Sequence, residues 1–238
     1  MNLPTLNYPI YDLELTTGKK IKIRPFLVKE KKLLLMAIEN ADMNENIKVI
    51  KDIIGACILD NVDVDELALI DIEKLFIMLK SKSDGEILET YFTCKNEVDD
   101  KECNMVIEIP INLNELKVED SKISSTINLT DAVHVKMKYP TFDLLEKLNG
   151  SNNDIELELS IVSSCIESIY DENDVYLAKN ATQEELTKFV ESIPENKYEM
   201  LMNFVRNTPR IKYEHKHKCP KCNFEHDIKL EGLSDFFI

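Results

Sequence analysis

Tryptophan is absent from the 238-residue sequence, and only five glycines occur in it. So few glycines argue against a Gly-rich loop that would cradle phosphate groups. The lack of tryptophan argues against a broad stacking platform for bases. No apolar stretch approaches the roughly eighteen residues of a membrane-spanning helix. The N-terminus also lacks the basic segment and long apolar core of a signal peptide, so we expect a chain that works in a reducing compartment.

Basic residues are scarce relative to acidic ones. Lys and Arg total 29 against 44 Asp and Glu, which gives a formal net charge of −15. A chain this acidic repels phosphate backbones, so nucleic-acid binding over a broad surface is not predicted. The apolar share of 44% and the charged share of 31% are typical of a folded globular protein. The acidic balance favours a basic protein partner.

Histidine is also too rare for most catalytic arrangements. Only four histidines occur, and three of them lie between residues 215 and 226, so no Ser-His-Asp arrangement can be argued. Acid pairs such as Glu184-Glu185 are interpreted as solvated helix faces. His134, alone in a strand pattern, is interpreted as structural. We predict no catalytic residues and no enzymatic activity.

Four of the six cysteines lie in two stretches that resemble each other. In each, a strand-like run ends at a cysteine (Cys94 or Cys219), and a second cysteine followed by asparagine (Cys103 or Cys222) begins the next strand. Structural Zn²⁺ takes four ligands at tetrahedral angles, and thiolates are common among them. We predict that Cys94, Cys103, Cys219 and Cys222 bind one structural Zn²⁺ and join the end of the chain to its middle.

Other interpretations of these cysteines stay open. His217 or His226 could replace a distant cysteine as a ligand, or the thiols could be free. A thioredoxin-like redox role is disfavoured, because a redox motif begins a helix and residues 224–230 have a strand pattern. A catalytic zinc is not predicted, since four thiolates leave no position for water. Cys57 and Cys165 lie in apolar helical stretches and are predicted to be buried.

The periodicity of apolar residues predicts an α+β fold that is rich in helix. Alternating apolar residues on both sides of a turn predict a β-hairpin over residues 11–24. Capping boxes that begin at Thr182 and Ser192 predict two helices. Residues 114–125 are interpreted as a polar connector. Further helices are expected at residues 28–39, 45–59, 71–82, 141–148 and 155–169, and a strand pair at residues 125–129 and 133–137.

These elements suggest three regions. Residues 1–86 would form an N-terminal hairpin followed by helices. Residues 87–113 and 209–238 would form a zinc-ribbon-like unit built from mid-chain and C-terminal β-knuckles. Residues 114–208 would form a strand pair and a helical region.

The chain ends with an apolar segment, which is unusual because free C-termini are normally polar. Either this segment packs onto the chain's own zinc unit, or it docks into a partner, since exposed apolar surface marks interaction sites. We expect that removing residues 236–238 would abolish partner binding and leave the fold intact. The predicted partner-binding residues are Leu233, Phe236, Phe237 and Ile238.

The C-terminal motifs resemble those of T4-like bacteriophage baseplate proteins, the small hub subunits and hub assembly factors of contractile-tailed phages. The resemblance is carried by residues 209–213, by Cys219-Pro220-x-Cys222 and by residues 230–237, and residues 24–31 also fit. It implies a baseplate hub component or a hub assembly chaperone that acts through contacts with tail proteins, without catalysis. It implies a place in the virion tail baseplate, or in the host cytoplasm during assembly. A metal role is implied only for Cys219 and Cys222.

The sequence leaves two other functions open. The first is a zinc-ribbon accessory protein for nucleic acid or transcription, because Lys and Arg outnumber Asp and Glu in residues 210–229. Its binding would weaken steeply with salt. The second is a thiol-dependent enzyme, which would lose its function when Cys219 is alkylated.

Overall fold

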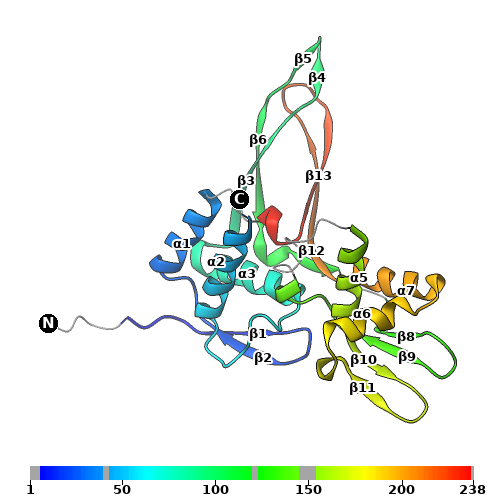
Figure 1. Cartoon of the computed structure of the whole chain (residues 1–238). Helices are drawn as coiled ribbons and strands as arrows, with labels where there is room; N and C mark the ends of the chain where they lie inside the picture. Colours follow the sequence, from blue (N-terminus) through cyan, green and yellow to red (C-terminus); the bar gives the residue numbers. More distant parts are fainter. Residues whose placement is uncertain (1–5, 40–42, 120–122, 145–153, 237–238) are drawn as a thin grey trace. The chain divides into compact units, whose positions relative to one another are not determined.

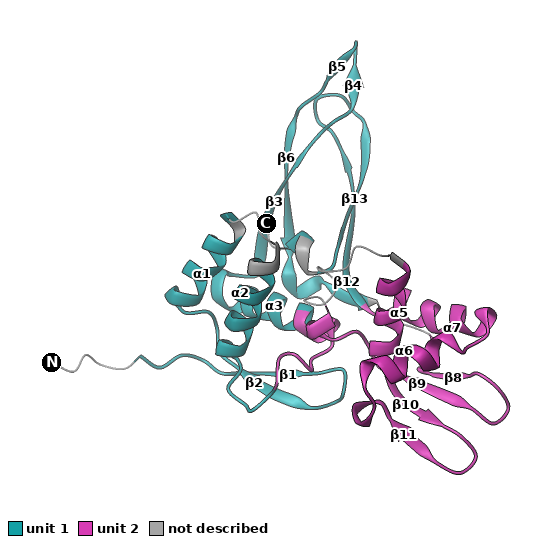
Figure 2. Cartoon of the chain, in the orientation of Figure 1, with its two compact units in different colours: residues 1–62, 73–119, 210–238 teal, residues 63–72, 120–209 magenta. Residues whose placement is uncertain are grey.

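The computed structural model describes residues 6–39, 43–119, 123–144 and 154–236. These residues form helices and several small antiparallel sheets, as the predicted α+β class requires (Figure 1). The chain divides into two compact units (Figure 2): unit 1 holds residues 1–62, 73–119 and 210–238, and unit 2 holds residues 63–72 and 120–209. Among the described helices, none has the length and apolar character that a membrane crossing requires.

Unit 1 begins with the predicted hairpin and helices. Strand β1 (Tyr11–Glu14) pairs antiparallel with β2 (Lys20–Ile23), and Gly18 takes a φ of +79° in the turn between them. Glycine adopts that conformation at little cost because it has no Cβ. The predicted helices follow as α1 (Val28–Glu39), α2 (Met43–Cys57) and α3 (Leu69–Asp84), of which residues from Glu73 onward belong to unit 1.

A buried ion pair joins the hairpin to α1 and α2. Arg24 Nη2 donates to Glu30 Oε1 at 2.8 Å and to the carbonyl oxygen of Ala56 at 2.7 Å. The other carboxylate oxygen of Glu30 accepts from the backbone N–H of Leu27 at 2.8 Å. Both charges therefore have hydrogen-bond partners, which offsets the cost of burying them. The pair fixes how the hairpin meets the two helices.

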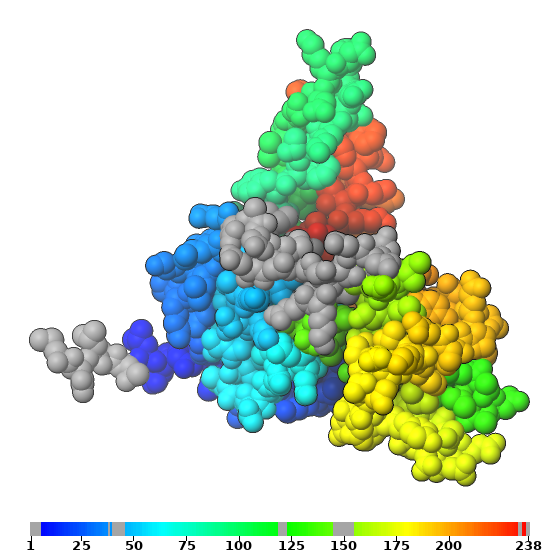
Figure 3. Space-filling model, in the orientation of Figure 1, coloured from blue at the N-terminus to red at the C-terminus, as the bar shows by residue number. Residues whose placement is uncertain are grey.

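Two long hairpins form what we call the arm of unit 1 (Figure 1). Strand β3 (Ile87–Thr93) pairs with β6 (Val106–Asn112), and β12 (Arg210–Lys218) pairs with β13 (Glu225–Glu231). A short hairpin lies between β3 and β6, consisting of β4 (Glu97–Val98) and β5 (Lys101–Glu102). Figure 3 shows the mid-chain part of the arm, in green, against the C-terminal part, in red. Two segments far apart in the sequence thus lie side by side.

The base of the arm contains a strand that the sequence does not predict. Strand β7 (Lys117–Glu119) pairs antiparallel with β12, just after the 3-10 helix η1 (Leu113–Glu115). It lies in residues 114–125, for which a polar connector was expected, and that expectation is wrong here. A three-residue strand has almost no signal of its own, so its state depends on β12, far along the chain.

The C-terminal segment returns to α3. The 3-10 helix η3 (Leu233–Phe236) follows β13, and the carbonyl oxygen of Phe236 accepts from Lys80 Nζ at 3.4 Å. The Phe236 side chain is only 1% exposed. Its ring therefore belongs to the core of this chain, and a partner could reach it only if the end of the chain opened. Phe237 and Ile238 lie outside the described residues.

Glu73 on α3 holds the base of the C-terminal hairpin. Its Oε2 accepts from the backbone N–H of Ile211 on β12 at 2.8 Å. A Cβ at Gly232, which has a φ of +75°, would lie 3.4 Å from Glu73 Oε1. Burial raises the pKa of Glu73, although the hydrogen bond from Ile211 acts in the opposite direction. A carboxylate that is hard to ionise thus lies where the end of the chain meets the helices.

This geometry predicts a pH effect on stability. A carboxyl whose pKa is raised on folding binds more protons in the folded state, so its contribution to stability falls as pH rises above its ordinary value of 4.5. Above the raised pKa, the contribution stays constant. Glu73→Gln keeps an oxygen for the Ile211 N–H and removes this titration. We expect the stability of the wild type relative to Glu73→Gln to decline from pH 4 toward neutrality in urea unfolding. If the free energy of unfolding changed with pH in the same way in both proteins, the prediction would be contradicted.

Unit 2 is a four-stranded antiparallel sheet packed with helices. The strand order is β11–β10–β9–β8, and the core that joins sheet and helices includes the fully buried Val135, Cys165 and Leu201. His134 Nδ1 lies 2.8 Å from Asn128 Oδ1 on the neighbouring strand, which fits a structural role. The elements are β8 (Thr126–Asn128), β9 (His134–Met137), α5 (Asp154–Ser164), β10 (Ile166–Tyr170), β11 (Val175–Leu177), α6 (Gln183–Glu191) and α7 (Glu195–Arg206).

Unit 2 confirms one capping box and corrects two other predictions. Thr182 Oγ1 accepts from the Glu185 N–H at 3.2 Å, and Glu185 accepts from the Thr182 N–H at 2.8 Å, as predicted. Ser192 is instead the C-cap of α6, and the N-cap of α7 is Pro194. The helix expected at residues 155–169 ends at Ser164, because the residues after it pair with β9 and β11. Of the helix expected at residues 141–148, residues 142–144 are helical, and residues 145–148 lie outside the described residues.

Candidate metal centre

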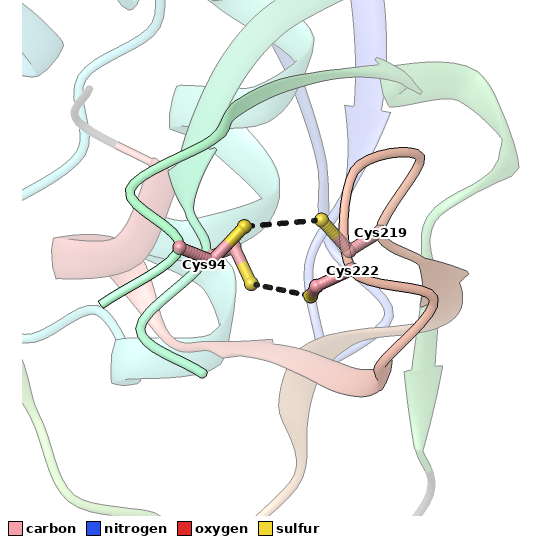
Figure 4. Close-up of side chains that lie close together, drawn as sticks. Cys94, Cys219 and Cys222 are labelled. Atoms are coloured by element: carbon pink, nitrogen blue, oxygen red, sulfur yellow. Dashed lines mark hydrogen bonds between the residues drawn. The ribbon is translucent and has the colours of Figure 1, made fainter. Parts of the chain in front are cut away.

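The four predicted cysteines lie together (Figure 4) in the turns at the outer end of the arm, which connect β3 to β6 and β12 to β13. All four sulfur atoms are within 4.8 Å of one another. Cys94 Sγ is 3.6 Å from Cys222 Sγ, and Cys103 Sγ is 3.8 Å from Cys219 Sγ. Three of the side chains are buried, and that of Cys222 is partly exposed. Each close pair joins the middle of the chain to its end.

The two halves of the cluster have the same backbone geometry. The N–H of Cys94 donates to the carbonyl of Met105, and the N–H of Cys219 donates to the carbonyl of Phe224, at 2.9 and 2.8 Å. In both halves, the N–H of the asparagine after the second cysteine donates back to the carbonyl of the first cysteine, at 2.9 Å. Asn104 and Asn223 have φ values of 51° and 60°.

Asparagine tolerates this left-handed conformation better than most residues do. The repeated Cys-Asn pair in the sequence therefore corresponds to two matching turns. Each turn contributes two sulfurs to the cluster. The first turn differs by an insertion, the β4–β5 hairpin, whose turn residues Asp99 and Asp100 also have positive φ. The insertion explains why Cys94 and Cys103 are farther apart in sequence than Cys219 and Cys222.

Polar groups from both hairpins surround the sulfurs. His226 Nε2 lies 3.1 Å from Cys94 Sγ, and Asn96 Nδ2 donates to Cys222 Sγ at 3.6 Å. Lys221 Nζ donates to the carbonyl oxygen of Cys103 at 2.7 Å. The His226 ring also contacts the rings of Phe92 and Phe224, with centroid distances of 5.0 and 4.8 Å. Donors at such positions stabilise negative charge on sulfur and orient it. Of these residues, the sequence singled out only His226.

The candidate histidine ligands are not part of the group of mutually close donor atoms. That group, found among the described residues, consists of the four cysteines alone. His226 contacts one sulfur, and His217 is paired with His226 across β12 and β13. The ring of His217 lies 5.9 Å from that of His215 on the same strand. The arrangement favours four cysteines as the ligand set, with His226 beside it.

The protonation of these thiols depends on their surroundings. Burial raises the pKa of Cys94 to about 12 and also raises the pKa of Cys103. The backbone N–H of Phe224 lowers the pKa of Cys222 to about 6. Of these three thiols, that of Cys222 therefore loses its proton most readily. Four sulfurs in this position could hold a metal ion, which would displace the remaining protons.

The other two cysteines are inert packing residues, as predicted. Cys57 and Cys165 are both 0% exposed. Burial raises the pKa of Cys57 to about 11 and that of Cys165 to about 12. A thiol that is buried and protonated is a poor nucleophile. Neither residue is a candidate for reactivity.

Comparison with known proteins gives one family match. A family model described as T4 bacteriophage base plate protein matches residues 8–238, nearly the whole chain. No curated protein and no solved structure matches the sequence or the fold. The match includes both hairpins of the arm, all four clustered cysteines and all of unit 2.

Proposed function

The chain belongs to the T4 bacteriophage base plate protein family, and we propose that it is a component of the central hub of the tail baseplate, or a chaperone for assembly of that hub. It acts through contacts with other baseplate proteins and catalyses no reaction. The observation that carries this proposal is the family match over residues 8–238. The burial of Cys57 and Cys165 fits a structural protein, because it leaves these two thiols without access to a substrate.

We further propose that the four clustered cysteines hold one structural Zn²⁺. Ligands about 2.3 Å from a tetrahedral zinc lie about 3.8 Å from one another. The distances of 3.6 and 3.8 Å between the close sulfur pairs agree with that value. Four thiolates also fit zinc by ligand type, and they leave no open position for water. The residues that would hold the ion are Cys94, Cys103, Cys219 and Cys222.

In this proposal, the metal makes the arm a rigid element. Each long hairpin alone would be marginally stable, because an isolated two-stranded ribbon buries little apolar surface. An ion bound at the outer end would tie the two hairpins together, while the contact of Glu73 with β12 holds the base. A rigid surface loses less conformational entropy when it binds a partner. The arm is thus suited to docking between proteins.

The charge pattern supports this proposal over a nucleic-acid role. The basic residues of β12 and β13 lie opposite acidic ones, with Lys229 Nζ 3.2 Å from Glu214 and Lys216 Nζ 3.8 Å from Asp227. These pairs offset the local excess of Lys and Arg that suggested the alternative. A phosphate backbone would require unpaired positive charge.

The test follows the chain through assembly. Tagged protein should co-sediment with baseplates or hub intermediates from infected cells, and this association should survive moderate salt. Mass spectrometry of mature virions separates the two roles, since a hub component stays in the particle and a chaperone leaves it. A chain that never co-sediments with any baseplate species would refute the proposal.

A further inference from the structure

The arm has two outward faces with very different chemistry. On β12 and β13, the four outward cross-strand pairs are Lys212–Glu231, Glu214–Lys229, Lys216–Asp227 and Lys218–Glu225. Each pair places a base opposite an acid, and all eight side chains are exposed. No apolar residue occurs among these eight described positions. This face is neutral and well suited to contact with water.

The outward face of β3 and β6 is apolar and acidic. Each of its four cross-strand pairs contains one apolar residue: Ile87 with Asn112, Pro110 with Glu89, Tyr91 with Glu108, and Val106 with Thr93. The exposed fractions are 54% for Ile87, 60% for Tyr91 and 55% for Val106. None of these eight described positions is basic, so Glu89 and Glu108 have no opposite charge on their own face.

We propose that the outward face of β3 and β6 is a docking surface for a baseplate protein that presents an apolar ridge flanked by Lys or Arg. This inference rests on the proposed function and names the part of the chain that carries it out. Tyr91 supplies the central anchor, because a half-exposed tyrosine offers a large apolar area and a hydroxyl. Glu108 lies directly across from Tyr91, and Glu89 lies two residues before it on the same strand, so both acids favour a partner with Lys or Arg around its apolar ridge.

The charge of the outward face of β3 and β6 argues for a different protein as its partner and against a second copy of this chain. A second copy of this chain docked through the same face would bring the carboxylates of one copy against those of the other. Like charges placed together in this way oppose association. The chain as a whole carries a net charge of −15, which adds to that repulsion. A different protein could cover the apolar residues of this face and also place basic residues next to Glu89 and Glu108.

A photo-crosslinking amino acid placed at Tyr91 tests the docking surface in infected cells. The matched control carries the same amino acid at Lys216, which is exposed on the other outward face. We expect Tyr91 to crosslink to one baseplate protein, identified by mass spectrometry, with a yield on the order of tenfold above that at Lys216. A double variant, Glu89→Lys with Glu108→Lys, should lower this yield roughly tenfold. Glu214→Lys, on the neutral face, should leave the yield unchanged.

The outcomes separate this inference from the proposal on which it rests. Equal yields from the two positions, a crosslink between two copies of this chain, or no crosslink while the chain still co-sediments with baseplates would overturn the docking surface alone. A chain that is absent from every baseplate fraction would overturn the proposed function as well. A crosslinked partner whose matching surface is acidic would contradict the charge argument.

Discussion

Replacing Cys219 with serine should abolish stoichiometric metal binding and open the outer end of the arm. The sulfur of Cys219 lies 3.8 Å from that of Cys103, so its loss breaks a link between the two hairpins. Structural zinc sites contribute roughly 10–16 kcal/mol of apparent binding free energy in small domains. The arm also packs on its own apolar residues, so we expect part of that loss, several kcal/mol, in the free energy of unfolding.

Hydrogen exchange of individual backbone amides measures the loss of stability at the outer end of the arm itself. In the Cys219→Ser protein, or after chelation of the wild type, the knuckle amides of Cys94, Asn104 and Asn223 should lose protection. Amides of β9 and β10 in unit 2 should keep theirs. Cys165→Ala is the matched control, because it removes a buried cysteine that lies outside the cluster and should leave the metal content unchanged. Unaltered protection of the knuckle amides after chelation would contradict the prediction.

Replacing Phe236 with alanine should destabilise unit 1 by about 3–5 kcal/mol. The ring is 1% exposed, and the carbonyl oxygen of the same residue accepts from Lys80. Loss of the ring would leave a cavity where η3 lies beside α3. Because this ring is buried, removal of residues 236–238, which the sequence suggests would leave the fold intact, should also lower the stability of unit 1.

Urea unfolding of the purified protein measures the change. Tyr91→Ala is the matched control, because Tyr91 is 60% exposed and its removal should cost less than about 1 kcal/mol. The two aromatic substitutions should therefore differ severalfold in their effect on stability. A Phe236→Ala protein as stable as the wild type would mean that the end of the chain is not part of the core, and Phe236 would again be a candidate for partner contact.

The candidate site could largely be predicted from the sequence, because its ligands are chemically distinctive. Cysteines are few, and the two similar stretches, each with a cysteine that ends a strand and a Cys-Asn pair that begins the next, identify four of them without any knowledge of the fold. The sequence could not predict which sulfur lies closest to which. Cys94 Sγ lies 3.6 Å from Cys222 Sγ, and that contact depends on how two hairpins far apart in the sequence pack together. The contact of Cys94 with His226 likewise depends on how β13 packs beside β3.

Elements with local signals were predicted well, and elements that depend on distant partners were not. The hairpin of β1 and β2 and the cap at Thr182 follow from neighbouring residues. Residues 166–170 and 117–119 are strands because of their pairing, and short apolar runs do not distinguish strand from helix. The false cap at Ser192 has a local reason, because Pro194 disfavours helical backbone at the residue before it.

The exposed face of β3 and β6 could not be found from the sequence. All the arm strands alternate with period two, so both hairpins predict one buried side and one solvated side. The sequence does not say that apolar residues occupy the solvated side of β3. Only the exposure of Tyr91 and Val106 in the folded chain distinguishes that face from the charged face of β12 and β13.

Metal analysis of the purified wild-type chain tests the central claim most directly. Elemental mass spectrometry of protein prepared without added metal should find one zinc per chain, and native mass spectrometry should show the corresponding mass, which disappears in the Cys94→Ser and Cys219→Ser proteins. A wild-type chain that is folded but free of stoichiometric metal, with all four thiols open to alkylation, would contradict the account.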